Sequence, residues 1–376
     1  MKLLLHGIDT LQCAYFLHAP DRQEIDFQML TEKKEEIRQS KAKNPFTVSL
    51  GNSEFLLQPY GSKSGYPLII SNEDFKIEVG EFNNPNFFVT FRSQALWRES
   101  AFLLHDKFLN WAASVGYWPY RDERLSRVDF SFDYNLPVID FDEDCFVSLS
   151  SKDSQYREDG KVQTFSFGKG DVVLRVYDKV AEIKQKSDKV WFFLLWEQDE
   201  NIWRIEWQIR KPVLKRFGIF TFDNLREQQG DLLSYLASEH DTLRQPNGDS
   251  NPSRWPLHPL WIDLQGQIEN LNHLGIDRIY GKNAVLEERM MRMAIAMYGY
   301  LKRVAAVYCV QTGEEPISVD EALTHISWRI NKLHEPLSWM MDVERRIREI
   351  LTWSRINGQT AKPRFSVDAF PQTLLG

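Results

Sequence analysis

Tyr177 stands between two cations in the stretch Val172–Lys179, which reads VVLRVYDK, with Arg175 two residues before it and Lys179 two residues after it. Apolar residues alternate with these three, which is the period-two pattern of a strand that buries one face. Arg175, Tyr177 and Lys179 are therefore predicted to share a face. A tyrosine hydroxyl between cations on a rigid strand has the composition needed to attack a phosphate. The alternative is an ordinary strand with a polar outer face.

Two further stretches repeat this design of one apolar and one polar face. Arg127–Tyr134 reads RVDFSFDY and Trp203–Lys211 reads WRIEWQIRK, and apolar residues alternate with polar ones in both. If these strands share a sheet with Val172–Lys179, their apolar faces form the core and their polar faces form one surface. That surface would carry Asp129, Asp133, Arg175, Tyr177, Lys179 and Glu206.

Three of these side chains, Asp129, Asp133 and Glu206, are carboxylates, and they would repel a phosphate. The set makes chemical sense with a divalent cation, and carboxylate oxygens with a few waters suit Mg²⁺ or Mn²⁺. The metal would polarise the phosphate. Arg175 and Lys179 would supply the positive field that a tyrosine, with an ordinary pKa near 10, needs at neutral pH.

The same faces allow a purely structural interpretation. Arg127, Arg204 and Arg210 lie on the predicted polar faces beside the carboxylates, so the three strands can form a ladder of cross-strand ion pairs. The sequence leaves this alternative open.

Composition sets broad limits on the class of protein. Hydrophobic content of 43% and charged content of 26% are ordinary for a globular protein. The net charge of −7 argues against nucleic-acid binding over the whole surface, although Lys211, Lys215 and Arg216 can form a local basic face. The three cysteines are few and widely spaced, which favours a reducing cytoplasm. No apolar run is long enough for a membrane span, so no membrane is expected as a partner.

The order of elements predicts an α+β protein with a separate helical region. Short β-rich runs between residues 46 and 91 form a meander, and a helix follows at Gln94–Val115. Pro137–Gly160 is a polar, acidic stretch that reads as a solvated helix start or a loop. Arg244–Arg254, RQPNGDSNPSR, reads as a linker. We therefore predict a curved, mostly antiparallel sheet with flanking helices in a catalytic domain over 1–243, a linker over 244–254, an all-helical C-terminal region over 255–356, and a tail over 357–376.

The motifs, taken in order, resemble a known family. GIDTL near the start, then RVDFSFDY, then FSFG followed by LRVYDK, and then WRIE are similar to the replication initiation factor family. These are the trans-acting Rep proteins of rolling-circle plasmids and some phages, with related relaxases of conjugative elements. The resemblance covers roughly residues 7–216. It implies catalytic roles for Tyr177, Arg175 and Lys179, and metal ligation by Asp129, Asp133 and Glu206.

The resemblance also implies an activity and its partners. The activity is a metal-dependent nick of one DNA strand at an origin, with a covalent 5′-phosphotyrosine link and a free 3′-hydroxyl that primes replication or accompanies transfer. The implied partner is single-stranded or supercoiled origin DNA, with a host helicase or polymerase and a second copy of the chain as further candidates. Nickases of the HUH class instead hold their metal through a His-apolar-His pair, which the eight histidines of this chain do not form.

Two other functions remain open at this point. A metal-dependent nuclease that activates water would cleave DNA without forming a covalent adduct, and Tyr177 would then be structural. A DNA-binding or regulatory protein would keep the sheet without the chemistry. No Walker A motif or dinucleotide-binding fingerprint is present, so no organic cofactor is expected.

Overall fold

The computed structural model describes residues 1–20, 25–40, 46–158, 160–187, 189–271, 282–313 and 315–356. The chain divides into two units, Met1–Ile279 and Tyr280–Gly376, and each is described by itself. The first unit contains the sheet, and the second contains three long helices.

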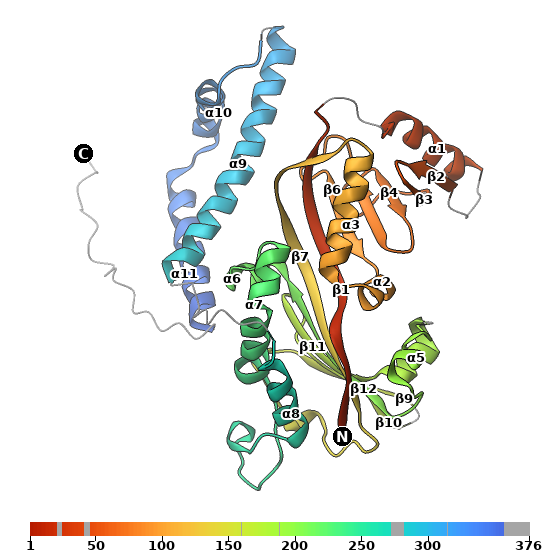
Figure 1. Cartoon of the computed structure of the whole chain (residues 1–376). Coiled ribbons are helices and arrows are strands. Elements are labelled where there is room, and N and C mark those ends of the chain that lie inside the picture. The colour runs from red at the N-terminus through yellow and green to blue at the C-terminus, as the bar shows by residue number, and fades with distance from the viewer. Residues whose placement is uncertain are drawn as a thin grey trace. The chain divides into compact units, whose positions relative to one another are not determined.

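Two long strands, β1 (Lys2–His18) and β7 (Trp118–Asn135), pair along their length and form the middle of the sheet (Figure 1). Within the described residues the sheet has 11 strands in the order β2-β3-β4-β5-β6-β1-β7-β12-β11-β10-β9, and a small second sheet pairs β13 with β8. Neighbouring strands are antiparallel. The remaining strands are β2 (Phe46–Leu50), β3 (Ser53–Leu57), β4 (Leu68–Ser71), β5 (Phe75–Val79), β6 (Phe87–Phe91), β8 (Phe146–Ser148), β9 (Asp153–Glu158), β10 (Lys161–Phe167), β11 (Val172–Asp178), β12 (Ile202–Arg210) and β13 (Asp241–Leu243).

Helices surround this sheet. In the first unit they are α1 (Phe27–Gln39), α2 (Ser93–Arg98), α3 (Ala101–Ser114), α4 (Lys179–Glu182), α5 (Phe192–Trp196), α6 (Lys211–Arg216), α7 (Phe222–Tyr235) and α8 (Pro259–Ile268). Short 3₁₀ turns lie at Glu143–Cys145 and Pro252–Arg254, and π-helical turns at Ile183–Ser187 and Leu236–His240. The predicted fold class, an α+β sheet with flanking helices followed by a helical region, is confirmed.

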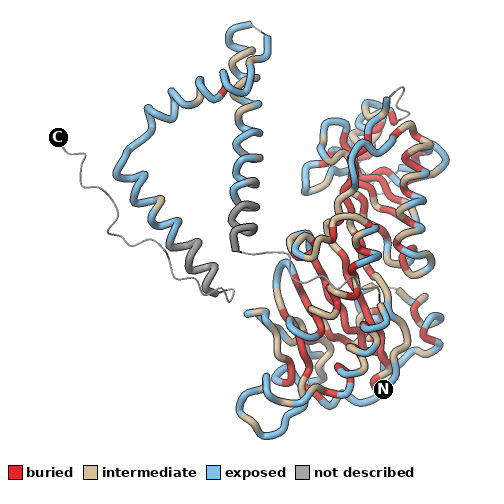
Figure 2. Tube along the Cα trace, turned by 60° about the vertical axis from the view of Figure 1, so that its left-hand side comes forward, coloured by how far each residue is buried: buried red, intermediate tan, exposed pale blue. Residues whose placement is uncertain are grey.

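The two faces of the sheet are covered by different helices. On the apolar face, Trp207 of β12 packs against Trp261 of α8, with ring centroids 5.6 Å apart. On the polar face, the Arg204 guanidinium lies 4.5 Å from the centre of the Phe192 ring of α5. Because both faces are covered, every residue of β12 except Arg210 is buried. Figure 2 shows the strands in the middle of the sheet as mostly red, which marks buried residues. The polar face is thus largely an interior surface rather than the open one that alternation predicts.

Two local predictions differ from the structure. The helix predicted at Gln94–Val115 is two helices, because Glu99 is extended and the Ser100 side chain caps the start of α3 by accepting a hydrogen bond from the Leu103 amide. The stretch Pro137–Gly160, predicted as a helix start or a loop, contains the 3₁₀ turn at Glu143–Cys145 and also the strands β8 and β9. β9 consists largely of polar residues at the edge of the sheet, so no apolar alternation marks it in the sequence.

The domain boundary also differs from the predicted one at 244–254. Residues 245–254 form a mostly exposed loop within the first unit rather than a connection between units. The chain returns to the core on both sides of this loop, because Arg244 bridges to Leu257 and the His258 amide donates to the Leu243 carbonyl. Helix α8 then buries a row of four apolar side chains in the main core, Leu260, Trp261, Leu264 and Ile268.

The described residues of the second unit form α9 (Lys282–Thr312), α10 (Val319–Leu333), α11 (Pro336–Ile356) and the segments between them. Ser318 and Glu321 form a capping box at the start of α10. Among the described side chains of this unit, Ala322 is the one that is buried. Where burial is shown, the tube of these helices is accordingly almost entirely pale blue and tan in Figure 2. In the described part of the chain, no helix has both the length and the apolar character that crossing a membrane requires. The predicted tail over 357–376 lies outside the described residues.

Candidate active site

The register of the sheet brings the three predicted polar faces together. Strand β12 lies between β11 and β7, so that Arg175 is opposite Glu206 on one side and Gln208 is opposite Asp129 on the other. The same pairing sets Arg204 between Tyr177 and Asp133. The prediction that these strands share one sheet, with their polar residues on one face, is confirmed.

Glu206 is the centre of the site, because it contacts both a candidate nucleophile and a cation. The Tyr177 hydroxyl donates a hydrogen bond of 2.9 Å to Oε2 of Glu206. Nη1 of Arg175 donates to Oε1 of the same carboxylate at 3.2 Å, and its Nη2 lies 3.4 Å from Oε1 of Gln208. Tyrosine, carboxylate and arginine therefore form one hydrogen-bonded group across adjacent strands.

Asp129 is paired with an arginine from its own strand. Nε of Arg127 donates to Oδ1 of Asp129 at 2.8 Å, and Nη2 of Arg127 donates to Oδ2. The Asp129 side chain is 2% exposed and that of Arg127 is 24% exposed. Burial raises the pKa of Asp129 to about 6; Arg127 opposes this shift and the charge of Glu206 adds to it. Asp129 and Glu206 are thus near enough to interact electrostatically.

Asp133 belongs to a different group, which we call the buried ion cluster: Asp9, Asp133, Lys189 and Arg204. Arg204 donates to both oxygens of Asp133, at 2.6 and 2.8 Å, and to Oδ1 of Asp9 at 2.8 Å. Lys189 donates to Oδ2 of Asp9 at 3.0 Å, and the Trp196 indole to Oδ2 of Asp133 at 2.9 Å. Arg204 and Asp133 are fully buried, so this cluster has the character of a structural ion pair network.

Lys179 does not continue the strand, contrary to the alternation that predicts it there. β11 ends at Asp178, whose side chain caps α4, and Lys179 is the first residue of that helix. Its ammonium is 5.5 Å from the centre of the Tyr177 ring and donates to Glu182 at 2.6 Å. Burial, with the charge of Arg204, lowers the pKa of Lys179. The structure therefore does place Lys179 beside Tyr177, but its ammonium lies over the face of the Tyr177 ring and not next to the hydroxyl.

Tyr177 itself is buried, and its protonation follows from that. Burial raises the pKa of Tyr177 well above its ordinary value, and the adjacent charge of Glu206 adds to the shift. In this arrangement the phenol is neutral at physiological pH. A nucleophilic role therefore requires a base at the hydroxyl, and Glu206 is the group in that position.

The ion-pair ladder, the structural alternative left open by the sequence, is present in the fold. Arg127 pairs with Asp129, Arg175 with Glu206, and Arg204 with Asp133. The predicted metal ligands therefore do not form a metal centre as they are arranged. Both oxygens of Asp133 accept from Arg204, and Oδ2 also accepts from Trp196. No group of three or more His, Cys, Asp or Glu side chains within the described residues could hold a metal.

Sequence reasoning passed over three side chains that contact this site. Asp9 sits at a register irregularity of β1, between Ile8 and Thr10, where strand alternation cannot assign its face. Lys189 follows the π-helical turn after α4, in a stretch with no clear period. Gln208 lies on the predicted polar face but carries no charge. A lone acid inside the apolar strand around GIDTL is the signal that points to Asp9.

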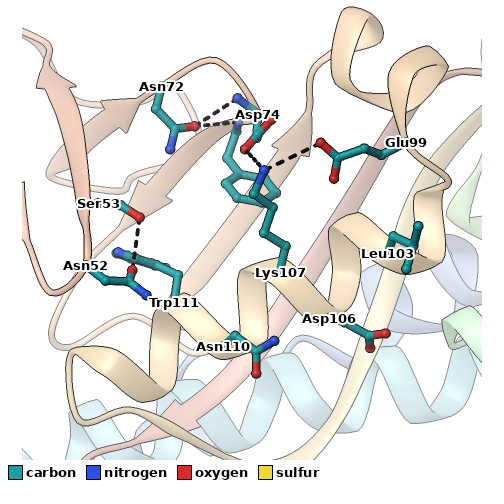
Figure 3. A pocket seen from close by; sticks show the side chains of 11 residues that line it. Asn52, Ser53, Asn72, Asp74, Glu99, Leu103, Asp106, Lys107, Asn110 and Trp111 are labelled. Carbon is teal, nitrogen blue, oxygen red and sulfur yellow. Dashed lines mark hydrogen bonds and ion pairs between the residues drawn. The ribbon is translucent and has the colours of Figure 1, made fainter.

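A pocket of about 420 Å³ lies elsewhere, between the turns that precede β3 and β5 and the outer side of α3 (Figure 3). Asp74 lies at 4% side-chain exposure in it and pairs with Lys107 at 2.7 Å and with Arg98 at 2.6 Å. None of the predicted site residues lines this pocket, so it is separate from the group around Tyr177 and Glu206.

Comparison with known proteins gives a match among solved structures. Neither the family models nor the curated proteins that we compared match this sequence. Among solved structures, the chain is similar to a rolling circle replication initiator protein from Geobacillus stearothermophilus, with 17% sequence identity and a TM-score of 0.44. The similarity covers 71% of this chain and 97% of that one.

Proposed function

We propose that this protein nicks one strand of DNA by attack of Tyr177 on a phosphodiester, as an initiator of rolling-circle replication or a relaxase. The order of the sequence motifs supports this proposal. The observation that carries it is the hydrogen bond of 2.9 Å from the Tyr177 hydroxyl to Glu206, with Arg175 on the other oxygen of that carboxylate. A nucleophile, a base and an anion-binding cation are thus adjacent on two neighbouring strands.

In the proposed reaction, Glu206 accepts the phenolic proton as the tyrosine oxygen attacks phosphorus. The O–P bond to Tyr177 forms, the bond from phosphorus to the 3′-oxygen breaks, and the 3′-oxygen leaves as a hydroxyl. Overall, one proton passes from the phenol to the leaving oxygen. The product is a 5′-phosphotyrosine link, and the liberated 3′-hydroxyl is available for priming or transfer.

Arginines on the same face provide the anion-binding part of the proposal. Arg127 and Arg210 are opposite each other in the β7–β12 register. Arg175 lies on the same face and contacts Gln208, which is two residues before Arg210 on β12. Arg175 and Arg127 are 34% and 24% exposed at their side chains, and Arg210 is the one exposed residue of β12. A guanidinium binds phosphate oxygens in pairs, so these three residues suit a DNA backbone.

We also propose Mg²⁺ or Mn²⁺ as cofactor, although side chains alone perform the proton transfer and the attack on phosphorus. Such an ion would stabilise charge on the phosphate oxygens. A second copy of the chain and a host helicase or polymerase stay predictions.

The test is incubation of the protein with Mn²⁺ and labelled single-stranded DNA carrying candidate origins, followed by a denaturing gel. We expect a labelled band displaced by the mass of the protein for the wild type. Tyr177→Phe removes only the hydroxyl and should abolish this band. Tyr156→Phe, on the edge strand β9, is the matched control and should retain it, because Tyr156 is 47% exposed and lies outside the site.

The rival functions give different results on the same gel. Cleavage without an adduct, surviving in Tyr177→Phe, identifies a nuclease that activates water. The other result is DNA that is retarded on a native gel but is neither cleaved nor linked to the protein, measured on origins that a known nickase cleaves. This result identifies a non-catalytic DNA-binding protein. Either result overturns the proposal.

A further inference from the structure

The face of the sheet that carries Tyr177 and Glu206 continues along β1 and β7 beyond the candidate active site. Every second residue of β1 in this part belongs to the hydrophobic core, namely Leu11, Cys13, Tyr15 and Leu17. The residues between them therefore lie on the opposite face of the sheet. One of these is Gln12, which is opposite Arg127 of β7, and Arg127 is opposite Arg210 of β12. Because Arg210 follows Glu206 by four residues on a regular strand, all of these side chains share the face of Glu206.

Three arginines of β7 lie on this face. The register sets Arg127 opposite Gln12, and it sets Arg124 and Arg121 opposite the next alternate residues of β1, Ala14 and Phe16. Together with Arg210 they form a set that we call the arginine row: Arg121, Arg124, Arg127 and Arg210. Its members at the two ends, Arg121 and Arg210, are exposed. The row thus runs from the candidate active site toward the far end of β7.

The local charge of this stretch favours an anion, although the whole chain is acidic. Trp118–Arg127 contains three arginines and two acids. One of the acids, Glu123, accepts a hydrogen bond of 3.0 Å from the Phe222 amide at the start of α7. In the described part of the chain, Arg127 is the member of the arginine row that pairs with a carboxylate. The other three guanidinium groups are therefore available to phosphate.

Aromatic side chains lie on the same face at the far end of the row. Trp118 and Tyr120 are 52% and 54% exposed. The Tyr120 ring contacts those of Phe16 and His18 edge-on, with centroids 6.4 and 5.8 Å apart, and the Arg121 guanidinium lies 4.7 Å from the centre of the Phe16 ring. Among the described strands, β1 and β7 pair here with each other alone, and the two form the long ribbon in Figure 1.

A single strand of DNA has the chemistry that this face recognises. Guanidinium groups bind phosphate oxygens, and every base has an aromatic face that stacks on tryptophan or tyrosine. A duplex offers the phosphates but keeps its base faces stacked on one another. At about 3.4 Å per residue, the distance from Arg127 to Trp118 is about 30 Å, which is enough for several nucleotides.

We propose that a single strand of DNA lies along this face, with its phosphates on the arginine row and unstacked bases on Trp118 and Tyr120. The row ends at Arg127 and Arg210, beside the group formed by Tyr177, Glu206 and Arg175, so it would hold the strand that Tyr177 attacks. This inference rests on the proposed function in taking DNA as the substrate, but the binding itself needs no nick.

The test of the arginine row is fluorescence anisotropy with a labelled oligothymidine of about 20 nucleotides, using the full chain in EDTA so that no cleavage intervenes. Arg121→Gln with Arg124→Gln should raise the dissociation constant about tenfold or more. The slope of log affinity against log salt should become shallower by about 1.4, because two single-strand phosphate contacts of about 0.7 each are lost. Arg38→Gln with Arg254→Gln is the matched control. It removes the same charge at side chains that are 70% and 72% exposed on α1 and on the loop 245–254, and it should change neither quantity.

The aromatic end is tested on the same oligonucleotide. Trp118→Ala with Tyr120→Ala should raise the dissociation constant about tenfold or more and leave the salt slope unchanged, because base stacking releases no counterions. Tyr60→Ala is the control, since Tyr60 is 59% exposed in the segment between β3 and β4, and it should bind as the wild type does. Circular dichroism establishes that each variant is folded.

Four results overturn the inference. The folded variants could bind the oligonucleotide as tightly as the wild type, or the wild type could fail to bind it. A duplex of the same length could bind as tightly as the single strand. Light scattering could show a dimer that Trp118→Ala with Tyr120→Ala dissociates, which would assign the face to a second copy of the chain. Failure of the proposed function appears separately, as the absence of a covalent adduct from a wild type whose binding of the oligonucleotide depends on these residues.

Discussion

At the scale of single residues, Glu206 determines what Tyr177 can do. As a hydrogen-bond acceptor it orients the phenol, and as a negative charge beside a buried group it raises the pKa of that phenol. These effects oppose each other for a nucleophile, because a neutral phenol is weak until its proton is removed. A base already in contact with the hydroxyl resolves the conflict, since deprotonation can accompany attack rather than precede it.

Glu206→Gln tests this role while preserving the shape of the side chain. An amide oxygen can still accept from Tyr177, but it cannot take the proton, so we expect the rate of adduct formation to fall about 100-fold. The free energy of unfolding should change by less than about 1 kcal/mol, because the partner Arg175 is 34% exposed. Gel-based kinetics and chemical denaturation measure the two quantities. Adduct formation at the wild-type rate would leave Glu206 without a catalytic role.

At the scale of elements, the buried ion cluster ties together segments that are distant in the sequence. Asp9 of β1 accepts from Arg204 of β12, from Lys189 before α5, and from Ser93 and Trp97 of α2. Burial alone would raise the pKa of Asp9, but the charges of Arg204 and Lys189 outweigh it and hold that pKa below its ordinary value. The ionised carboxylate therefore stabilises the fold.

The lowered pKa of Asp9 determines how the stability of the fold depends on pH. A carboxyl whose pKa is lower in the folded state contributes its stabilisation above the unfolded pKa, about 3.9, and loses it as the pH falls below that value. Asp9→Asn should lower the free energy of unfolding by about 3 kcal/mol at pH 7, because it removes one of the two carboxylates that face the buried Arg204 and the carboxylate that pairs with Lys189. The difference from wild type should shrink below about pH 4. Denaturant titrations at about pH 7 and about pH 3.5 measure both.

Asp199→Asn is the control for that experiment. Asp199 is exposed in the bend before β12, so its replacement should change stability by no more than about 0.5 kcal/mol at either pH. A difference between Asp9→Asn and wild type that stays constant down to the lower pH would contradict the linkage.

Sequence alternation was sufficient to place Asp129, Glu206 and Tyr177 on one face, because β7, β11 and β12 are regular and strictly period-two there. Alternation gave wrong or incomplete predictions where the regular strand geometry ends. Lys179 opens a helix because Asp178 caps it, and Asp9 sits at an irregularity of β1. Alternation also cannot show what covers a polar face. The burial that fixes the protonation of Tyr177 comes from helices whose packing is set by tertiary contacts.

At the scale of the whole molecule, the described residues of the first unit form a hydrophobic core, and the described residues of the second unit form almost none. Both hydrophobic clusters of the described residues belong to Met1–Ile279, and they include α8. Among the described side chains of the second unit, Ala322 alone is buried. Because burial of apolar area is the main favourable term in folding, the stability of the sheet should be independent of α9–α11.

A chain ending at Ile279 should therefore unfold cooperatively, with a midpoint within about 3 °C of the full-length value, which corresponds to about 1 kcal/mol. A chain ending at Leu243, where the composition of the sequence suggests a domain boundary, should behave differently. It lacks Trp261, which is fully buried against Trp207, and loss of one such residue costs about 3–5 kcal/mol. Calorimetry on the two truncated chains decides between the boundaries. Equal midpoints would show that α8 adds nothing to the core and that the boundary lies at the loop after all.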